Sequence, residues 1–261
     1  MENQCTMYQE SIENRPTVSV AMAVYNGEKF IREQIDSILC QLEKTDELVI
    51  SYDKSTDSTW DIINSYSGKD ARVKCFKNPY TPGVVHNFQN ALEHTSNEIV
   101  FYSDQDDYWQ EAKVEKVLEE FKDSEVTVVI HDASLTDEKL NVTHPSTFKL
   151  RGGVKTSFWG NLVRLRYIGC CMAFRARFKE VILPIPMKYS SHDWWTGSIC
   201  TFGGGKMVAI HEPLIYHRIH NANVSPTKRP PLREQLEWRW LILSNLIKRY
   251  RKRISLNGNN S

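Results

Sequence analysis

Residues 99–109 read IVFYSDQDDYW, an apolar run that leads directly into three carboxylates. The apolar part has the length and composition of a buried β-strand. Asp104, Asp106 and Asp107 follow it closely, and like charges at such short separation repel one another. A divalent cation such as Mn²⁺ or Mg²⁺ would relieve that repulsion, because hard cations prefer oxygen ligands. The alternative is that Asp106 or Asp107 caps a helix that begins near Gln110.

Strand and helix patterns alternate on both sides of this stretch. Strand-like runs lie at residues 17–24, 47–51, 72–76, 98–102 and 126–131, and helical spacing of apolar residues separates most of them. Such alternation predicts βαβ units and therefore an α/β fold with a mostly parallel sheet flanked by helices. Ligands bind such sheets at the carboxyl ends of the strands. The loops at Asp53 and at 104–107 both follow predicted strands, so we expect them to share one edge of the sheet.

The second half of the chain has a looser pattern. Residues 134–167 are loop-rich, the apolar segment 167–174 (YIGCCMAF) predicts a strand, and HDWW at 192–195 predicts the start of a helix. We expect three parts: an N-terminal extension over residues 1–16, a main domain over 17–226, and a basic amphipathic helix with a tail over 227–261.

Composition limits the classes of protein. The 261 residues are 41% hydrophobic and 25% charged with a net charge of +1, which is ordinary for a globular protein and gives no overall reason to expect a nucleic-acid partner. Six cysteines without a CxxC pair favour a reducing cytoplasm over a disulfide framework or a zinc site. The chain shows neither a signal peptide nor an apolar run of the roughly 20 residues that a membrane span needs.

The segment after Pro231 predicts an amphipathic helix with one apolar face. That face contains Leu232, Leu236, Trp240, Leu243 and Ile247. The same segment carries many cations, namely Arg233, Arg239, Lys248, Arg249, Arg251, Lys252 and Arg253. A basic helix with tryptophans can lie in an anionic membrane interface. The alternative is that the apolar face packs on the main domain and the basic end is solvated.

A nicotinamide-dependent dehydrogenase is excluded by the turn after the first strand. Such an enzyme needs a GxGxxG turn there, and residues 25–30 read YNGEKF, with one glycine.

An ordered series of motifs identifies a family. They are VYNGEKFIREQIDSIL at 24–39, STDST at 55–59, SDQDDYW at 103–109, HDWW at 192–195 and RIH at 218–220. From about residue 17 to 225 this series resembles the family 2 glycosyltransferases of the GT-A fold. The resemblance is strongest to the bacterial rhamnosyltransferase-like branch, which builds surface polysaccharide.

The resemblance assigns roles to individual residues. Asp104-Gln105-Asp106 matches the DxD motif, with Asp106 as the direct metal ligand and Asp104 shared between the metal and the donor nucleotide. His220 matches a position near the diphosphate and is a third candidate ligand. Tyr25 and Asp53 match positions that contact the donor nucleotide.

The resemblance also implies a catalytic and an acceptor region. Asp193 matches the catalytic base, although it could instead be a helix N-cap. Gly169, Cys170, Cys171 and Met172 match a segment beside the sugar pocket. Trp194 and Trp195 offer flat faces on which a sugar ring could stack, or they belong to the core of the same helix.

One loop departs from the family pattern. The family usually has DDGS where this chain has Tyr52-Asp53-Lys54-Ser55, so the first acid is absent and a lysine replaces a glycine. Because of this departure, the sequence does not identify the nucleotide base of the sugar donor.

The expected reaction follows from these roles. A cation stabilises the leaving diphosphate, and one base removes the proton of the acceptor hydroxyl. A single displacement inverts the anomeric centre. The expected donor is dTDP-rhamnose or a UDP-linked hexose, and the expected acceptor is a lipid-linked sugar or glycan at the inner face of the cell membrane. The alternative is a non-catalytic nucleotide- or glycan-binding homologue that serves as a partner subunit, which the altered loop would suit.

Overall fold

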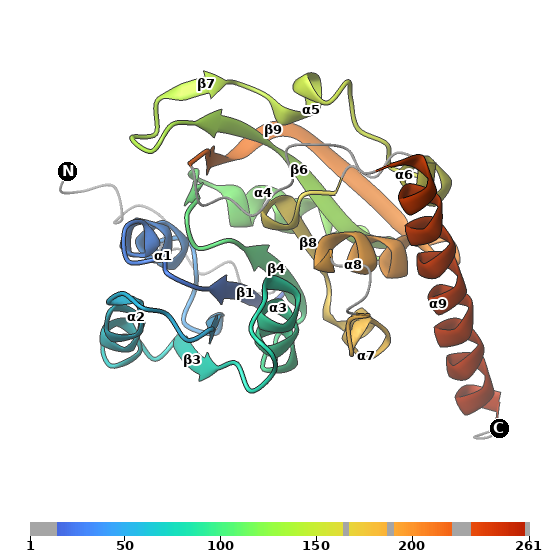
Figure 1. Ribbon diagram of the computed structural model, residues 1–261, viewed down its shortest axis with the longest axis horizontal. Coiled ribbons are helices and arrows are strands. Elements are labelled where there is room, and N and C mark those ends of the chain that lie inside the picture. The colour runs from blue at the N-terminus through green and yellow to red at the C-terminus, as the bar shows by residue number, and fades with distance from the viewer. Residues whose placement is uncertain (1–14, 164–166, 187–190, 221–230, 259–261) are drawn as a thin grey trace.

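The computed structural model describes residues 15–163, 167–186, 191–220 and 231–258, without the side chains of residue 232 and residues 251–258. Figure 1 shows a central sheet with helices packed against it and a long C-terminal helix on one side. This arrangement confirms the α/β fold that the alternating sequence pattern predicts.

The sheet contains nine strands in the order β3-β2-β1-β4-β8-β6-β9-β5, with β7 paired to β6. Their bounds are β1 Val18–Val24, β2 Glu47–Tyr52, β3 Val73–Lys77, β4 Ile99–Ser103, β5 Tyr108–Trp109, β6 Val126–Thr136, β7 Val142–His144, β8 Met172–Arg175 and β9 Lys206–Arg218. Strands β3, β2, β1 and β4 pair in parallel. Strand β8 is antiparallel to both β4 and β6, and β9 is parallel to β6. Strands β6 and β9 therefore point the same way as β1 to β4, which makes the sheet mostly parallel.

The helices lie between and after these strands. Their bounds are α1 Ile31–Leu39, α2 Thr59–Ser67, α3 Val84–Glu93, α4 Lys113–Glu120, α5 Thr147–Leu150, α6 Phe158–Val163, α7 Lys179–Ile182, α8 His192–Thr201 and α9 Leu232–Gly258, with 3₁₀ turns η1 Gly169–Cys171 and η2 Ala176–Phe178.

Two hydrophobic cores cover the two faces of the sheet. Alternation along β1 sends Val20 and Met22 to one face and Ala21 to the other. Helices α1, α2 and α4 pack on the first face, and α3, α7, α8 and α9 pack on the second. With both faces covered, the carboxyl ends of the strands are where polar loops can gather.

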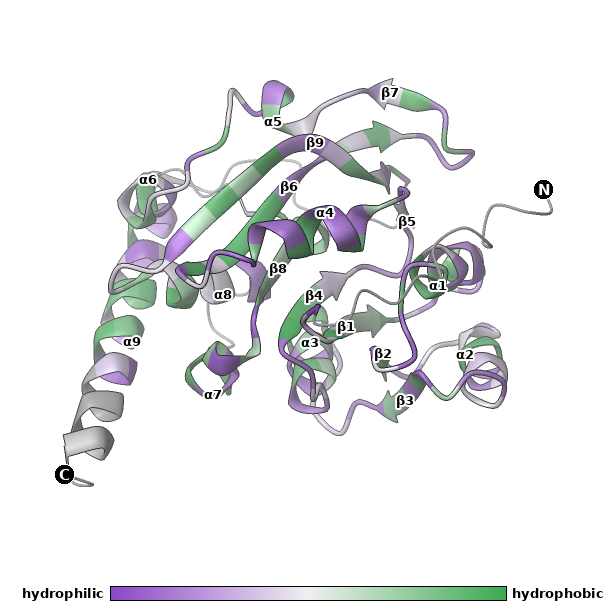
Figure 2. Ribbon diagram, turned by 180° about the vertical axis from the view of Figure 1, so that it is seen from behind, coloured by the Kyte–Doolittle hydropathy of each residue, from purple (hydrophilic) through white to green (hydrophobic). Residues whose placement is uncertain are grey.

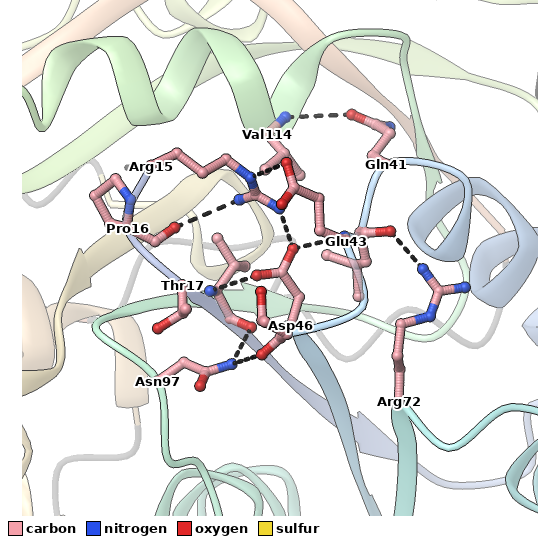
Figure 3. A network of polar contacts seen from close by, with 12 residues as sticks. Arg15, Pro16, Thr17, Gln41, Glu43, Asp46, Arg72, Asn97 and Val114 are labelled. Atoms are coloured by element: carbon pink, nitrogen blue, oxygen red, sulfur yellow. Dashed lines mark hydrogen bonds and ion pairs between the residues drawn. The ribbon is translucent and has the colours of Figure 1, made fainter. Parts of the chain in front are cut away.

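A polar network anchors the opposite, amino-terminal end of β1 (Figure 3). Arg15 donates from Nε to Glu43 Oε1 at 2.6 Å and also pairs with the buried carboxylate of Asp46. The two oxygens of Asp46 accept hydrogen bonds from the backbone N–H groups of Val18 and Glu43, each at 2.8 Å. The α1–β2 connection is thereby fixed to the start of β1, away from the acidic loops.

Two element boundaries differ from the sequence prediction. The helix expected near Gln110 begins at Lys113, because Tyr108 and Trp109 form β5 against β9. The strand expected over 167–174 is β8, Met172–Arg175, preceded by the turn η1.

Helix α9 packs through a different face from the predicted one. Ile242 and Leu246 are buried against the domain, whereas Leu236 and Trp240 of the predicted face are 57% and 68% exposed. Arg249, expected in a solvated or lipid-bound end, donates to the carbonyl oxygens of Val181, Leu183 and Pro184. Within the part of the chain that the structure describes, none of the helices combines the length and apolarity needed to cross a membrane.

Candidate active site

The acidic loop after β4 faces two histidines, His217 near the end of β9 and His220 directly after this strand. Asp107 is fully buried, and its Oδ1 lies 2.7 Å from His217 Nδ1. Asp106 Oδ2 lies 2.8 Å from His220 Nε2. The structure thus brings together Asp106 and His220, two of the predicted metal ligands, which lie 114 positions apart in the sequence. His217, three residues before His220, has no role in the sequence prediction.

Burial and mutual repulsion set the charges of the three acids. Burial, followed by the charges of Asp107 and Asp106, raises the pKa of Asp104 to about 8. Burial and Asp107 also raise the pKa of Asp106. Burial acts on Asp107 in the same direction, but the charge and hydrogen bond of His217 outweigh it and lower the pKa of Asp107. Burial would lower the pKa of His217, and Asp107 instead raises it to about 10. Asp107 and His217 thus form an ion pair.

A buried lysine lies behind this pair. Lys113 is 1% exposed, donates from Nζ to Cys170 O at 3.1 Å and places its ammonium 3.8 Å from the ring centroid of Trp109. Burial lowers its pKa to about 8, while the cysteines and the acids Asp107 and Asp104 raise it. The sequence prediction did not include this residue, because a lysine in an amphipathic helix is usually solvated.

These contacts neutralise the charge of Asp107, whereas the carboxylates of Asp104 and Asp106 remain available to bind a ligand. None of the described residues donates a hydrogen bond to the carboxylate of Asp104. The carboxylates of Asp104 and Asp106 and the imidazole of His220 are the ligand types of a divalent cation such as Mn²⁺ that keeps positions for diphosphate oxygens. Their ligand atoms do not all lie within 4.8 Å of one another in this structure, whereas those of Asp107, Cys170 and His217 do. We assign the latter group to the Asp107–His217 ion pair, in which Oδ1 of Asp107 contacts the imidazole and the buried Oδ2 has no hydrogen-bond partner among the described residues.

Gln105, the middle residue of the DxD motif, joins this loop to the end of β1. Its Oε1 accepts from Tyr25 N at 2.8 Å, and its Nε2 donates to Tyr25 O at 2.7 Å. A Cβ on Gly27 would lie 2.5 Å from the same Oε1, so a side chain there would displace Gln105. Tyr25, whose backbone makes these two hydrogen bonds, is 53% exposed. The sequence prediction treated Gln105 only as a spacer.

Asp53 is engaged within the protein. It is 5% exposed, and its two oxygens accept from Asn78 Nδ2 at 2.6 Å and Gly83 N at 2.9 Å. The hydroxyl of Tyr52 accepts from Ser55 N at 2.9 Å, so the residue that replaces the family's first acid orders the loop. Lys54 is exposed.

Asp193 lies in the first turn of α8, and Ser191 holds the N-cap position, so the N-cap interpretation is wrong. Asp193 is 7% exposed, and burial raises its pKa to about 7 against the opposing effects of the Trp194 N–H and the charge of Arg151. Its charge also raises the pKa of Asp104, which places both acids in one electrostatic environment.

Gly169 leaves the space that this region needs. A Cβ at Gly169 would lie 2.5 Å from His192 Nε2 and 3.6 Å from Asp193 Cβ. Cys170 and Cys171 follow in the turn η1, each 1% exposed, and pack as small buried side chains.

Two residues predicted to line a sugar pocket, Met172 and Trp195, pack inside the fold, and a third, Trp194, is half-buried. Met172 is 1% exposed in the core of β8. Trp195 is 4% exposed and donates from Nε1 to Ile182 O at 2.8 Å. The ring of Trp194 lies 5.9 Å from that of Trp238 on α9. We therefore withdraw Met172 and Trp195 from the pocket, because neither presents a free face.

A mostly parallel sheet with an acidic loop after β4 and a buried acid at the start of α8 defines a GT-A nucleotide-sugar transferase. The family model for Glycosyl transferase family 2 matches residues 19–182. The chain belongs to this family.

Known relatives agree with that assignment. The UDP-Glc:alpha-D-GlcNAc-diphosphoundecaprenol beta-1,3-glucosyltransferase WfaP of Escherichia coli is 39% identical over 97 residues, which cover 37% of this chain and 38% of WfaP. A crystal structure of S. aureus TarS 1-349 in complex with UDP-GlcNAc has a TM-score of 0.67 at 19% identity, covering 88% of this chain and 66% of that one. The mannosyltransferase PcManGT of Pyrobaculum calidifontis, in complex with GDP-Man and Mn²⁺, has a TM-score of 0.59 at 20% identity, covering 93% and 65%. The two structures establish the fold.

Proposed function

We propose that the protein transfers a sugar from a nucleotide diphosphate to an acceptor hydroxyl with inversion at the anomeric carbon. The observation that carries this proposal is the joint placement of Asp104, Asp106 and His220 with the buried Asp193. The first group suits a cation-bound diphosphate, and Asp193 has the pKa of a general base that works near neutral pH.

The residues divide the chemistry between leaving group and nucleophile. Asp104, Asp106 and His220 would hold the cation, which when bound neutralises charge on the departing diphosphate. Asp193 accepts the proton of the acceptor hydroxyl as that oxygen bonds to the anomeric carbon and the bond to the diphosphate breaks. One displacement without a covalent intermediate inverts the centre.

We propose a UDP-linked hexose as the donor. The names of WfaP and of the TarS complex carry UDP-Glc and UDP-GlcNAc, respectively. Sequence resemblance to a rhamnosyltransferase-like branch makes dTDP-rhamnose the competing donor. Asp53 and the Tyr52 loop lie beside β1, where Tyr25 is exposed, and these residues would read the base.

We propose a sugar on a lipid diphosphate as the acceptor, for surface polysaccharide synthesis at the inner face of the membrane. WfaP is named for such an acceptor, GlcNAc-diphosphoundecaprenol. The chemistry proposed for the site requires only a hydroxyl close to Asp193, so the choice of acceptor rests on this similarity.

Calorimetric titration of UDP and of dTDP, each with Mn²⁺ and with EDTA, tests the donor site. We expect UDP to bind in Mn²⁺, to lose at least about tenfold affinity in EDTA, and to lose it likewise in Asp106→Ala. Asp61→Ala, which removes an exposed carboxylate of α2, is the matched control. Equal binding in EDTA would contradict the metal, and preference for dTDP would reassign the donor.

A further inference from the structure

Helices α6 and α9 carry an exposed apolar surface that no described part of the chain covers. It contains Trp159 and Val163 of α6 and Leu236 and Trp240 of α9, which are 65%, 71%, 57% and 68% exposed. We call these four residues the α6–α9 patch. Single exposed apolar residues are ordinary, but two tryptophans grouped with two aliphatic side chains indicate a surface that contacts something.

The four residues belong to one surface because a single arginine clamps the two helices. Arg239 of α9 donates from Nε to Leu162 O and from Nη2 to Val163 O, each at 2.8 Å. Figures 1 and 2, seen from opposite sides, both place α6 beside the first turns of α9.

The patch is separate from the face that attaches α9 to the domain. Attachment uses Ile242 and Leu246, which are buried, and Tyr250, whose hydroxyl donates to Ile199 O at 2.7 Å. Helix α9 thus has two apolar faces, and packing within the chain satisfies one of them. The outward face contains Leu236 and Trp240 of the stripe that the sequence predicts, whereas Leu243 and Ile247 of that stripe are half-buried.

The surroundings of the patch carry an excess of positive charge on the side of α6. Residues 139–179 contain no aspartate or glutamate, and residues 238–261 contain none either. Exposed Lys149, Arg151 and Lys155 precede α6, whereas on α9 the exposed Arg233 pairs with Glu237 at 3.1 Å. Tryptophans flanked by lysine and arginine are the combination that an anionic membrane interface binds, through burial of the rings and attraction to the headgroups.

We infer that the α6–α9 patch docks the protein on the surface of a bilayer that contains anionic lipid. The charge of Arg151, in the segment between α5 and α6, acts on Asp193. Docking would therefore bring the proposed catalytic base close to the headgroup layer, where a lipid diphosphate presents its sugar. The docking surface itself does not depend on which sugar is transferred, although its use rests on the proposed lipid-linked acceptor.

Flotation of the full chain with vesicles tests the inference. We expect binding to vesicles of phosphatidylcholine with phosphatidylglycerol, weaker binding to phosphatidylcholine alone, and a decrease as salt is raised. The double variant Trp159→Ser/Trp240→Ser should bind at least about tenfold more weakly, because two aromatic rings no longer enter the interface. Val142→Ser removes an apolar side chain that is 50% exposed on β7, outside the patch, and should bind like the parent.

Brominated lipids add a direct readout, since they should quench tryptophan fluorescence in the parent and much less in the double variant. Absence of vesicle binding by the parent, or equal binding by the double variant, would overturn the inference. If light scattering showed that the parent is a dimer which the same substitutions dissociate, and the parent did not bind vesicles, the patch would be reassigned to self-association. Calorimetric UDP binding on the same samples separates these outcomes from misfolding and from failure of the donor site.

Discussion

At the scale of the residue, Asp193 owes its basicity to burial. Burial raises its pKa to about 7, so the carboxylate is half protonated near neutral pH. Because the base must be deprotonated, we expect kcat to rise with pH through a limb near 7 and to level off above it. Asp193→Asn should lower kcat by about 10²-fold or more and abolish the limb. A pH profile of initial rates with a soluble acceptor checks this, and an unchanged limb in the variant would assign the base elsewhere.

Arg151 offers a finer test of the same charge. Its guanidinium lowers the pKa of Asp193, opposing the effect of burial. Arg151→Ala should therefore move the limb of the kcat profile to higher pH, with little change on the plateau. Lys155→Ala removes another exposed cation of the same segment and serves as the control. A shift to lower pH, or equal shifts in both variants, would show that Arg151 does not act on Asp193.

Residue identity predicted positions better than it predicted contacts. The family resemblance places Asp106 and His220 at one site, and the structure brings them to 2.8 Å from each other. The DxD motif gives Gln105 no role, because only the folded chain shows that Tyr25 lies within reach of its amide. Trp195 was open to two interpretations in sequence, and burial of its indole in the domain decided between them.

At the scale of the element, Gln105 couples the loops after β1 and β4. Its two hydrogen bonds to Tyr25 hold the proposed donor-contacting turn against the acidic loop. The variant Gln105→Ala leaves the backbone of both loops in place but removes the two hydrogen bonds that join them. We expect the KM for the nucleotide sugar to rise by up to about 30-fold, and kcat to change less, since two hydrogen bonds of about 1 kcal/mol each are lost.

The control for that variant is Asn64→Ala, which removes an exposed amide on α2. Steady-state kinetics with varied donor gives both constants. If kcat fell instead while KM stayed constant, Gln105 would act on the reacting geometry rather than on donor binding.

Elements formed by local periodicity were predictable, and elements formed by distant pairing were not. Strand β4 follows from its apolar run, whereas β5 exists because Tyr108 and Trp109 meet Tyr216 and Ile215 of β9. Helix α9 was predicted, but its packing face was not, because apolar residues lie on two sides of the helix. Ile242 and Leu246 are buried only because α8 and α7 happen to lie there.

At the scale of the whole molecule, the site forms where the two halves of the sheet meet. Strands β1 to β4 bring Tyr25, Asp53 and the acidic loop to one edge, as parallel pairing requires. Strand β9 contributes His217, and α8 contributes Asp193, both from the half beyond β8. The acids of the donor side thus come from the first half, whereas His217, His220 and the proposed base come from the second, so neither half holds the complete site.

The acidic site should lower the stability of the ligand-free protein. Burial and its acidic neighbours raise the pKa of Asp104 to about 8, well above that of an aspartate in an unfolded chain. The folded protein therefore binds more protons than the unfolded chain between about pH 4 and 8, so stability falls as the pH rises through this range. Asp104→Asn removes the charge at every pH. At pH 8 we expect this variant to melt a few degrees above the parent when EDTA is present, since about 1 kcal/mol moves Tm by roughly 2–4 °C in a domain of this size.

Mn²⁺ should reverse the order. The parent should gain stability by binding the cation, and Asp104→Asn should gain much less because it has lost a ligand. Thermal melts of both proteins at pH 6 and pH 8, with Mn²⁺ and with EDTA, measure the four differences. Asp61→Asn, at an exposed position, should follow the parent throughout. A variant less stable than the parent in EDTA at pH 8 would contradict the prediction, because it would mean that the Asp104 carboxylate stabilises the ligand-free fold.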